Sequence, residues 1–189
     1  MVLVKPDGVK RGLVGEIVSR FERAGLKIIA MKMVWVDEAM VRKHYPTTRK
    51  EWVKKIGEKT LKAYEEYGKD PREHLGSLEP FEIGKMVCKW LVDYLTSGPV
   101  LAMVLEGNHA IPIVRKICGY TYPDTAVPGT IRGDYSIDSP DLANEQKRSG
   151  KNLVHASGST EEAKFEEELW FHKNEIFEYK RVAEDEMFG

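Results

Sequence analysis

The stretch that decides the fold reads VLAMVL and runs from Val100 to Leu105. All of its residues are apolar, and the helix-stopping sequence Ser97-Gly98-Pro99 comes directly before it. A short run of this composition is typical of a β-strand that is buried on both faces. The sequence therefore predicts a sheet whose interior includes this strand.

Two further strands precede it in the chain. Val2–Val4 is apolar and ends at Lys5-Pro6-Asp7-Gly8, because proline lacks a backbone donor and Asp-Gly favours a turn. The run from Leu26 to Val36 alternates and predicts a long strand. One face of that strand is expected to carry Ile29, Met31, Met33 and Trp35, and the other Ile28, Ala30 and Val34.

Amphipathic helices are expected between the strands. Leu13, Ile17 and Phe21 recur every four residues, which predicts a helix that Gly25 closes. Other helices are expected from a cap at Asp37 to His44-Tyr45-Pro46, over Ile83–Leu95, over Ala110–Cys118 with Ile111, Val114 and Ile117 inward, and from a cap at Thr160 to Trp170.

The segments between and after these helices carry different signals. Residues Thr121–Ser139 are rich in Pro, Gly, Asp and Thr without a period, so a long ordered loop is expected. A short strand should follow around His155, with Leu153 on the face of His155 and Val154 on the other. The charged tail from Phe171 to Gly189 is expected on the surface or at a subunit contact.

The order of these elements is strand, helix, strand, helices, strand, helix, loop, strand, helix. This order is the split βαβ, or ferredoxin-like, pattern, an α+β fold with helices on one face of a four-stranded antiparallel sheet. The length of 189 residues suits a single domain over 1–189. Residues 47–84 are charged and helix-prone, and residues 138–151 are polar, so both are expected to be peripheral additions.

Composition limits the partners and the compartment. The formal net charge of −1 offers no general attraction to nucleic acid or to an acidic membrane. Cys88 and Cys118 are far apart and are interpreted as buried hydrophobic residues of a reduced compartment. There is no signal-peptide pattern, and no apolar stretch approaches the ~20 residues of a membrane span. We therefore expect a cytoplasmic protein without a nucleic-acid or membrane partner.

Candidate chemistry centres on one histidine and three cations. His155 ends a short apolar run and is followed by small residues, which leave room beside the imidazole, although a lone histidine there is more often structural. Lys5, Arg115 and Arg132 come from separate segments and together could neutralise a polyphosphate, although each alone would be a solvated surface charge. The remaining histidines are interpreted as structural or surface residues: His44, His74, His109 and His172.

Ordered motifs along the chain resemble those of the nucleoside diphosphate kinase family. They are KPDGV with RGLVGEI (5–17), TSGPV (96–100), PGTIRGD (128–134), NLVHAS (152–157) and LWF (169–171). The resemblance covers nearly all of 1–47 and 90–171. It implies that the terminal phosphoryl group of a nucleoside triphosphate passes to a nucleoside diphosphate by a ping-pong route through a phosphohistidine. It also implies Mg²⁺ on the nucleotide phosphates, with no metal ligand from the protein.

The same resemblance implies roles for particular side chains. His155 would be the nucleophile, since a neutral imidazole is a good nucleophile near pH 7. The residues that would bind nucleotide phosphate or sugar are Lys5, Arg115, Thr121, Arg132 and Asn152. Those that would hold the histidine and its phosphoryl group are Tyr45, Ser157 and Glu166.

The chain departs from the family pattern at several places. Gly158 stands where the family usually has an aspartate, which affects how Mg²⁺ or its water is held. The base-stacking aromatic position falls on Val87, so Phe81 or Trp90 would substitute, or apolar contact alone would hold the base. In the family layout 47–84 and 138–151 are insertions that flank the nucleotide cleft, and we hypothesise that they modify its rim or the subunit contacts.

An active kinase has two alternatives. A catalytically weak nucleotide-binding or scaffolding module on the same fold would be favoured by Gly158 and the missing aromatic. A nucleic-acid-binding sheet would need exposed strand aromatics and a basic face, and neither is evident in the sequence. The resemblance implies broad base tolerance and a homo-oligomer, either a hexamer or a tetramer, built from dimers.

Overall fold

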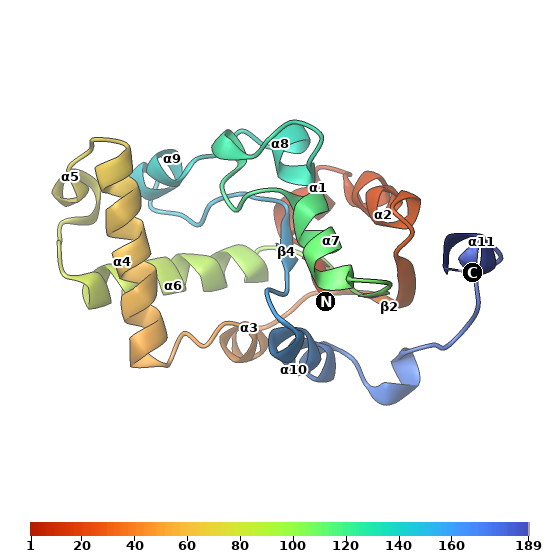
Figure 1. The fold of residues 1–189 in the computed structure, drawn as a ribbon. Helices are drawn as coiled ribbons and strands as arrows, with labels where there is room; N and C mark the ends of the chain where they lie inside the picture. Colours follow the sequence, from red (N-terminus) through yellow and green to blue (C-terminus); the bar gives the residue numbers. More distant parts are fainter. Residues whose placement is uncertain (189) are drawn as a thin grey trace.

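A four-stranded antiparallel sheet forms the centre of the computed structural model, which describes residues 1–188 (Figure 1). Its strands are β1 (Val2–Val4), β2 (Lys27–Val34), β3 (Val100–Glu106) and β4 (Val154–Ala156), in the order β2-β3-β1-β4. The predicted ferredoxin-like α+β topology is confirmed. The apolar run VLAMVL lies in β3, between β2 and β1, and all of it is buried.

Helices connect the strands and surround the sheet. The α-helices are α1 (Pro6–Lys10), α2 (Val14–Arg23), α3 (Glu38–His44), α4 (Lys50–Glu66), α5 (Pro71–Leu75), α6 (Pro80–Thr96), α7 (Ala110–Cys118), α8 (Ile131–Tyr135), α9 (Pro140–Glu145), α10 (Thr160–Trp170) and α11 (Glu184–Phe188). Two 3₁₀-helices join them, η1 (Pro123–Thr125) and η2 (Lys173–Glu175). In the part of the chain that the structure describes, no helix combines the length and the apolar character needed to cross a membrane.

Side-chain caps decide where several helices begin. The carboxylate of Asp37 accepts the N–H of Met40 at 2.8 Å, which confirms the predicted start of α3. The predicted cap of α10 is wrong by one residue, because the hydroxyl of Ser159 accepts the N–H of Glu162 at 3.2 Å. Helix α6 begins at Pro80 rather than Ile83, since proline at the first helical position needs no donor.

Short helices occupy segments that were expected to be turns or loops. Lys5 to Gly8 leads into α1, because Pro6 fixes a helical φ at its first position. The expected loop at 121–139 contains η1 and α8, and the Thr130 hydroxyl caps α8 by accepting the N–H of Gly133 at 3.1 Å. The polar stretch 138–151 contains α9. Helices of one or two turns are too short to show an apolar period.

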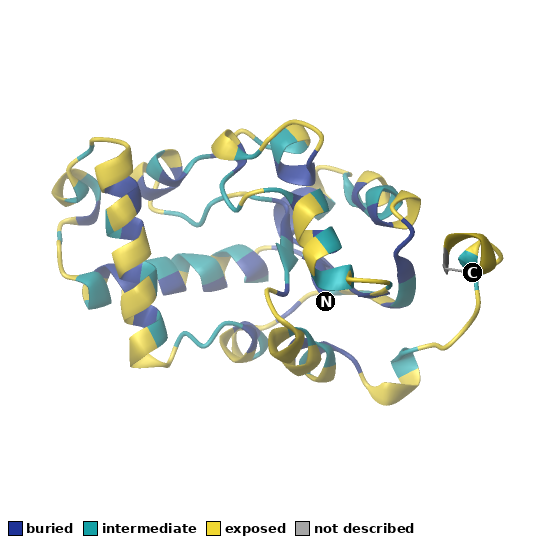
Figure 2. Cartoon of the chain, in the orientation of Figure 1, coloured by how far each residue is buried: buried dark blue, intermediate teal, exposed yellow. Residues whose placement is uncertain are grey.

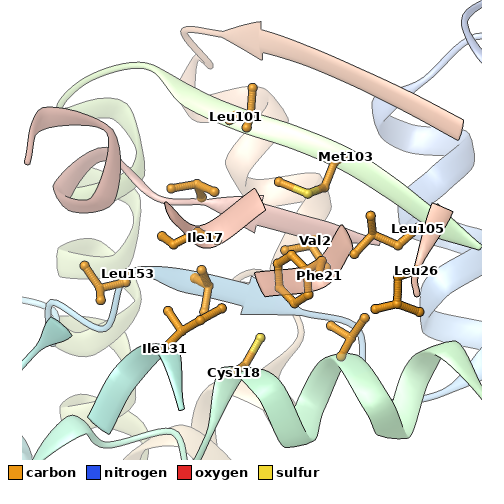
Figure 3. Close-up of a cluster of buried hydrophobic side chains, with 13 residues drawn as sticks. Val2, Ile17, Phe21, Leu26, Leu101, Met103, Leu105, Cys118, Ile131 and Leu153 are labelled. Carbon is orange, nitrogen blue, oxygen red and sulfur yellow. The ribbon is translucent and has the colours of Figure 1, made fainter. Parts of the chain in front are cut away.

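Helices cover both faces of the sheet, so the expectation of one covered face is wrong. One face packs against α2, α7 and α8 and forms the first core cluster, shown in Figure 3. The other face packs against α3, α6 and α10 and forms the second core cluster. The physical reason lies in β1 and β3, whose residues are buried whichever face they point to, apart from the terminal Glu106. Strands of this kind need a layer on each side.

Local irregularities overturn three predicted side-chain orientations. A register shift between Ile28 and Ala30 in β2 places Ile28 with the first core cluster and Ile29 with the second, the reverse of simple alternation. Leu153 has a φ of 66°, so it precedes β4 and packs with Val154 in the first core cluster.

In α7, Ile113 packs against that cluster, and Ile111 does not.

The charged stretch 47–84 forms an end of the molecule in which α4 crosses α6 (Figure 1). The crossing is very close: a Cβ on Gly57 would come 1.7 Å from the Pro80 carbonyl oxygen. A Cβ on Gly84 would come 1.9 Å from the Val53 carbonyl oxygen, so both positions require glycine. Figure 2 shows buried and exposed residues alternating along α4, as expected for a helix with one packed side.

The C-terminal tail runs beside the start of β2. The N–H of Phe177 donates to the Ile29 carbonyl at 2.8 Å, and the Tyr179 hydroxyl donates to the Ile28 carbonyl at 2.7 Å. Beyond this contact three apolar side chains are exposed to solvent. Their exposed fractions are 51% for Met31, 58% for Met33 and 68% for Trp35. The tail thus packs on the surface of the chain as far as α11, and Gly189 lies outside the described residues.

Candidate active site

The imidazole of His155 is held from one side by a carboxylate. His155 lies in β4, and its Nε2 is 2.7 Å from Oε1 of Glu166 on α10. The second carboxylate oxygen accepts a hydrogen bond of 2.6 Å from the Ser157 hydroxyl. This pairing places the ring proton on Nε2, so the other ring nitrogen, Nδ1, keeps its lone pair. The Tyr45 hydroxyl lies 3.4 Å from that Nδ1.

Electrostatics keep this imidazole neutral. Burial lowers the pKa of His155 well below its usual value, and the positive charges of Lys5 and Arg132 act in the same direction. Burial raises the pKa of Glu166, while the nearby His44 opposes that shift. A neutral histidine with one nitrogen occupied and the other available is the state in which imidazole acts as a nucleophile.

His44 belongs to the same site, although the sequence indicated only a structural or surface histidine. Its ring centroid is 4.5 Å from that of His155, and its Nδ1 accepts the Trp170 indole N–H at 3.2 Å. Burial lowers the pKa of His44 to about 3. Only its position directly before Tyr45 pointed to the site. His44 therefore packs against the reactive ring as a neutral side chain.

A cleft of ≈ 400 Å³ opens in front of His155. Its walls are formed by residues that lie far apart in the sequence, from Lys5 after β1 to Glu162 on α10. The predicted site residues that line it are Lys5, Tyr45, Arg115, Thr121, Arg132, Asn152 and His155. Ser157 and Glu166 are buried behind the histidine. The cleft therefore combines an available imidazole nitrogen with several cations.

Lys5 and Asn152 form the junction between β1 and β4 at the cleft. The Lys5 ammonium donates to the Asn152 side-chain oxygen at 2.7 Å, and the Asn152 amide donates to the Thr121 carbonyl at 2.9 Å. Burial, together with the charge of Arg132, lowers the pKa of Lys5 to about 7. An anion bound in the cleft would favour the charged ammonium.

The Arg132 guanidinium donates most of its hydrogen bonds to backbone carbonyl oxygens. It donates to the carbonyls of Asn152 at 3.1 Å, Gly119 at 2.8 Å and Val154 at 2.7 Å. The side chain is buried and lines the cleft as well. Arg132 therefore joins α8 to β4 and to the end of α7, and it carries a positive charge beside His155.

A carboxylate from α10 lies directly beside Gly158. The N–H of Gly158 donates to Oε2 of Glu162 at 2.7 Å. A Cβ on Gly158 would come 2.9 Å from that oxygen and 3.6 Å from the guanidinium of Arg115. Glu162 lines the cleft, so an acidic group is present near the glycine although the sequence places none at 158.

A second, largely apolar cavity of ≈ 210 Å³ adjoins the cleft. Lys5, Thr121 and Asn152 line both spaces, so the two are contiguous. Of the three candidates for the base-contacting position, Val87 and Trp90 line this cavity, and Phe81 lines neither space. Its other aromatic walls are Trp52 and Tyr122. No periodic pattern in the sequence indicates that Trp52 and Tyr122 would meet.

The histidine pKa leads to a direct prediction. In an NMR titration of the free protein, the ring resonances of His155 should not shift between pH 8 and pH 5.5, because its folded pKa lies well below 6.5. The resonances are assigned by their loss in His155→Ala. A titration of this ring with a midpoint near 6.5 would show that burial and the neighbouring cations do not hold it neutral.

A neutral imidazole that faces a cationic cleft defines a class of protein, an enzyme equipped for phosphoryl transfer through histidine. Comparison with known proteins gives the particular family. The family model described as Nucleoside diphosphate kinase matches residues 1–58 and 72–176. The chain belongs to the nucleoside diphosphate kinase family.

Relatives and solved structures agree with this assignment. A nucleoside diphosphate kinase from Pyrobaculum aerophilum is 54% identical over 178 residues, which cover 94% of this chain and 97% of the relative. A crystal structure of an NDP kinase from that organism superposes with a TM-score of 0.88 at 53% identity, covering 94% of this chain and 97% of the other. A structure of the Borrelia burgdorferi nucleoside diphosphate kinase, described as a transition state mimic with bound vanadate and ADP, gives a TM-score of 0.77 at 40% identity and covers 98% and 93%.

Proposed function

We propose that this chain is an active nucleoside diphosphate kinase in which Nδ1 of His155 carries the phosphoryl group between two nucleotides. The observation that carries the proposal is the pairing of Nε2 with Glu166 at 2.7 Å, which leaves Nδ1 available. Membership of the family supplies the substrates, a nucleoside triphosphate as donor and a nucleoside diphosphate as acceptor.

The chemistry follows from these contacts. Nδ1 attacks the terminal phosphorus, a P–N bond forms, and the P–O bond to the departing diphosphate breaks. The ring keeps its Nε2 proton and gains positive charge, which the Glu166 carboxylate offsets. A second diphosphate then attacks the phosphorus, the P–N bond breaks, and the imidazole returns to its neutral state. Phosphoryl transfer of this kind requires alignment and charge compensation more than covalent work by the protein.

The cleft residues are assigned roles by their positions. Arg115, Arg132 and Lys5 would compensate the phosphate charge, and Tyr45 would contact the phosphoryl group beside Nδ1. Thr121 and Asn152 would meet the sugar or an inner phosphate at the junction of the two spaces. Ser157 orients Glu166 through its hydrogen bond and would act as a positioning residue.

Mg²⁺ fits this site only through the nucleotide. The cluster of potential metal ligands, His44, His155 and Glu166, is buried and rich in nitrogen, and both oxygens of Glu166 are already hydrogen bonded. Mg²⁺ prefers oxygen ligands and octahedral geometry, so this cluster does not suit it. Bound to the phosphates, the ion would neutralise their charge, and Glu162 would offer a carboxylate at the cleft.

The whole chain, 1–189, is proposed as a single domain of this family that functions in the cytoplasm, with insertions at about 47–84 and 138–151. The unmatched residues 59–71 of the family comparison fall inside the first insertion. Both insertions contribute walls to the apolar cavity, which supports a role at the rim of the nucleotide site.

A homo-oligomer is proposed from the exposed edge of the sheet. β2 is the terminal strand, and Met31, Met33 and Trp35 are exposed beside it. Exposed apolar edge strands favour association. Met33→Asp should therefore reduce the mass measured by light scattering. Ile137→Asp, at an exposed position away from β2, should leave it unchanged. A monomeric wild type, or an unchanged mass for Met33→Asp, would contradict this interface.

Labelling with γ-³²P-ATP tests the function. The protein should acquire an acid-labile, alkali-stable label, and an added nucleoside diphosphate should discharge it. The alternative, a binding or scaffolding module with little turnover, predicts nucleotide binding without label. Absence of label under conditions that saturate the site would therefore reject the kinase and favour that module.

A further inference from the structure

The apolar cavity next to the phosphate cleft contains one buried side chain whose hydrogen-bonding groups are unused. Asn144 lies on α9 within the second insertion, lines the cavity and is only 8% exposed. Among residues 1–188 its side-chain amide has no hydrogen-bond partner. Its amide atoms are not among the fully enclosed side-chain atoms without a partner, so solvent in the cavity reaches them and a ligand there can replace that water.

The other buried polar side chains on the cavity wall already have hydrogen-bond partners. Asp138 receives two hydrogen bonds from the Arg148 guanidinium, at 2.6 and 2.7 Å. The Thr60 hydroxyl donates to the Ile56 carbonyl at 3.0 Å, and Asn152 is held by Lys5 and Thr121. Among the buried polar side chains of this wall, Asn144 is therefore the one without a hydrogen bond in residues 1–188. Thr121, Tyr122 and Ser149 are half-buried and offer one hydroxyl each, whereas the amide of Asn144 offers separate donor and acceptor atoms.

The surroundings of Asn144 suit a flat aromatic ligand. The cavity has apolar walls from α4 and α6, among them Trp52, Val87 and Trp90, and Tyr122 closes another side. Burial raises the pKa of Tyr122 to about 12, in keeping with a neutral phenol in an apolar setting. Because Lys5 and Asn152 also line the phosphate cleft, a ligand in the cavity can be continuous with one in the cleft.

We infer that Asn144 hydrogen bonds the 6-position edge of a purine base held in this cavity. An amide presents one acceptor and two donors, which match a ring nitrogen and its neighbouring exocyclic group. Rotation of the amide suits either the amino group of adenine or the oxo group of guanine. The inference rests on the proposed function and goes beyond it, because stacking and sugar contacts alone would not distinguish the substituents of the base.

Nucleotide analogues that lack the 6-amino group, or the whole base, test this assignment. Wild type should bind ADP about ten-fold more tightly than purine riboside 5′-diphosphate, which has hydrogen in place of the amino group, since one good bidentate pair is worth about 1–3 kcal/mol. In Asn144→Ala that ratio should fall close to one, while the affinity for ribose 5-diphosphate, which has no base, stays unchanged. This comparison does not depend on turnover.

Thr60→Val is the matched control. Thr60 lines the same cavity and is equally buried, but its hydroxyl is satisfied within α4, so the ratio of the two affinities should persist. A ratio near one in wild type overturns the inference, and this outcome does not depend on whether any variant folds. The inference is also overturned if the ratio is unchanged in Asn144→Ala, or if Thr60→Val loses the ratio to the same extent as Asn144→Ala. Failure of the proposed function would appear separately, as an absence of phosphoryl label on wild-type His155.

Discussion

Replacing His155 with alanine should reduce phosphoryl transfer by at least about four orders of magnitude, because removal of a covalent nucleophile cannot be offset by binding alone. The label from γ-³²P-ATP should disappear as well. The structure supports an intact fold in this variant, since the ring borders the cleft and is not part of either core cluster. Rates are measured by coupled assay, and folding by circular dichroism.

His109→Asn is the matched histidine control. His109 is exposed and has a φ of 48°, a conformation that asparagine adopts readily. Its substitution should leave both the label and the rate unchanged. Turnover of His155→Ala comparable with wild type would show that another group accepts the phosphoryl, and the account of the site would be wrong.

Replacing Arg132 with methionine should impair both stability and activity. Three backbone carbonyls would lose their charged donor, which predicts a decrease of about 3 kcal/mol in the free energy of unfolding. Loss of a positive charge beside His155 should also lower the transfer rate about a hundred-fold or more, by analogy with other removed transition-state contacts. Urea denaturation and steady-state kinetics measure the two effects.

Arg115→Met separates these two contributions. Arg115 lines the same cleft but is exposed on α7, so its loss should lower the rate while the free energy of unfolding changes by no more than about 0.5 kcal/mol. If Arg132→Met were as stable as Arg115→Met, the carbonyl contacts of Arg132 would not stabilise the fold as the structure indicates.

The sequence predicted those elements whose apolar residues recur with a regular period or whose ends are marked by helix- or strand-breaking residues. The alternation in β2, the apolar run of β3 and the four-residue repeat of α2 all gave the correct element. The number of covered faces could not be predicted, because a strand buried on both faces does not show which helices bury it. The bulge at Ile28/Ala30 and the positive φ of Leu153 were likewise hidden, since each breaks a pattern at a single residue.

The candidate site shows the same division. The motifs contain Lys5, Arg132, Asn152 and His155, which line the cleft. The wider family resemblance indicated the other predicted lining residues, Tyr45, Arg115 and Thr121. The motifs did not indicate that His44 packs against the His155 ring, because a tertiary contact between α3 and β4 leaves no trace in local sequence. Nor did they predict the apolar cavity, because its walls come from separate segments, including α4, α6 and α9, that only the tertiary fold brings together.

The position of the phosphoryl group on the ring tests the central claim most directly. Labelled protein is digested in alkali, and the two phosphohistidine isomers are separated by chromatography. Because Glu166 occupies Nε2, the account predicts label on Nδ1 of His155. Label on Nε2, or on a residue other than His155, would contradict it.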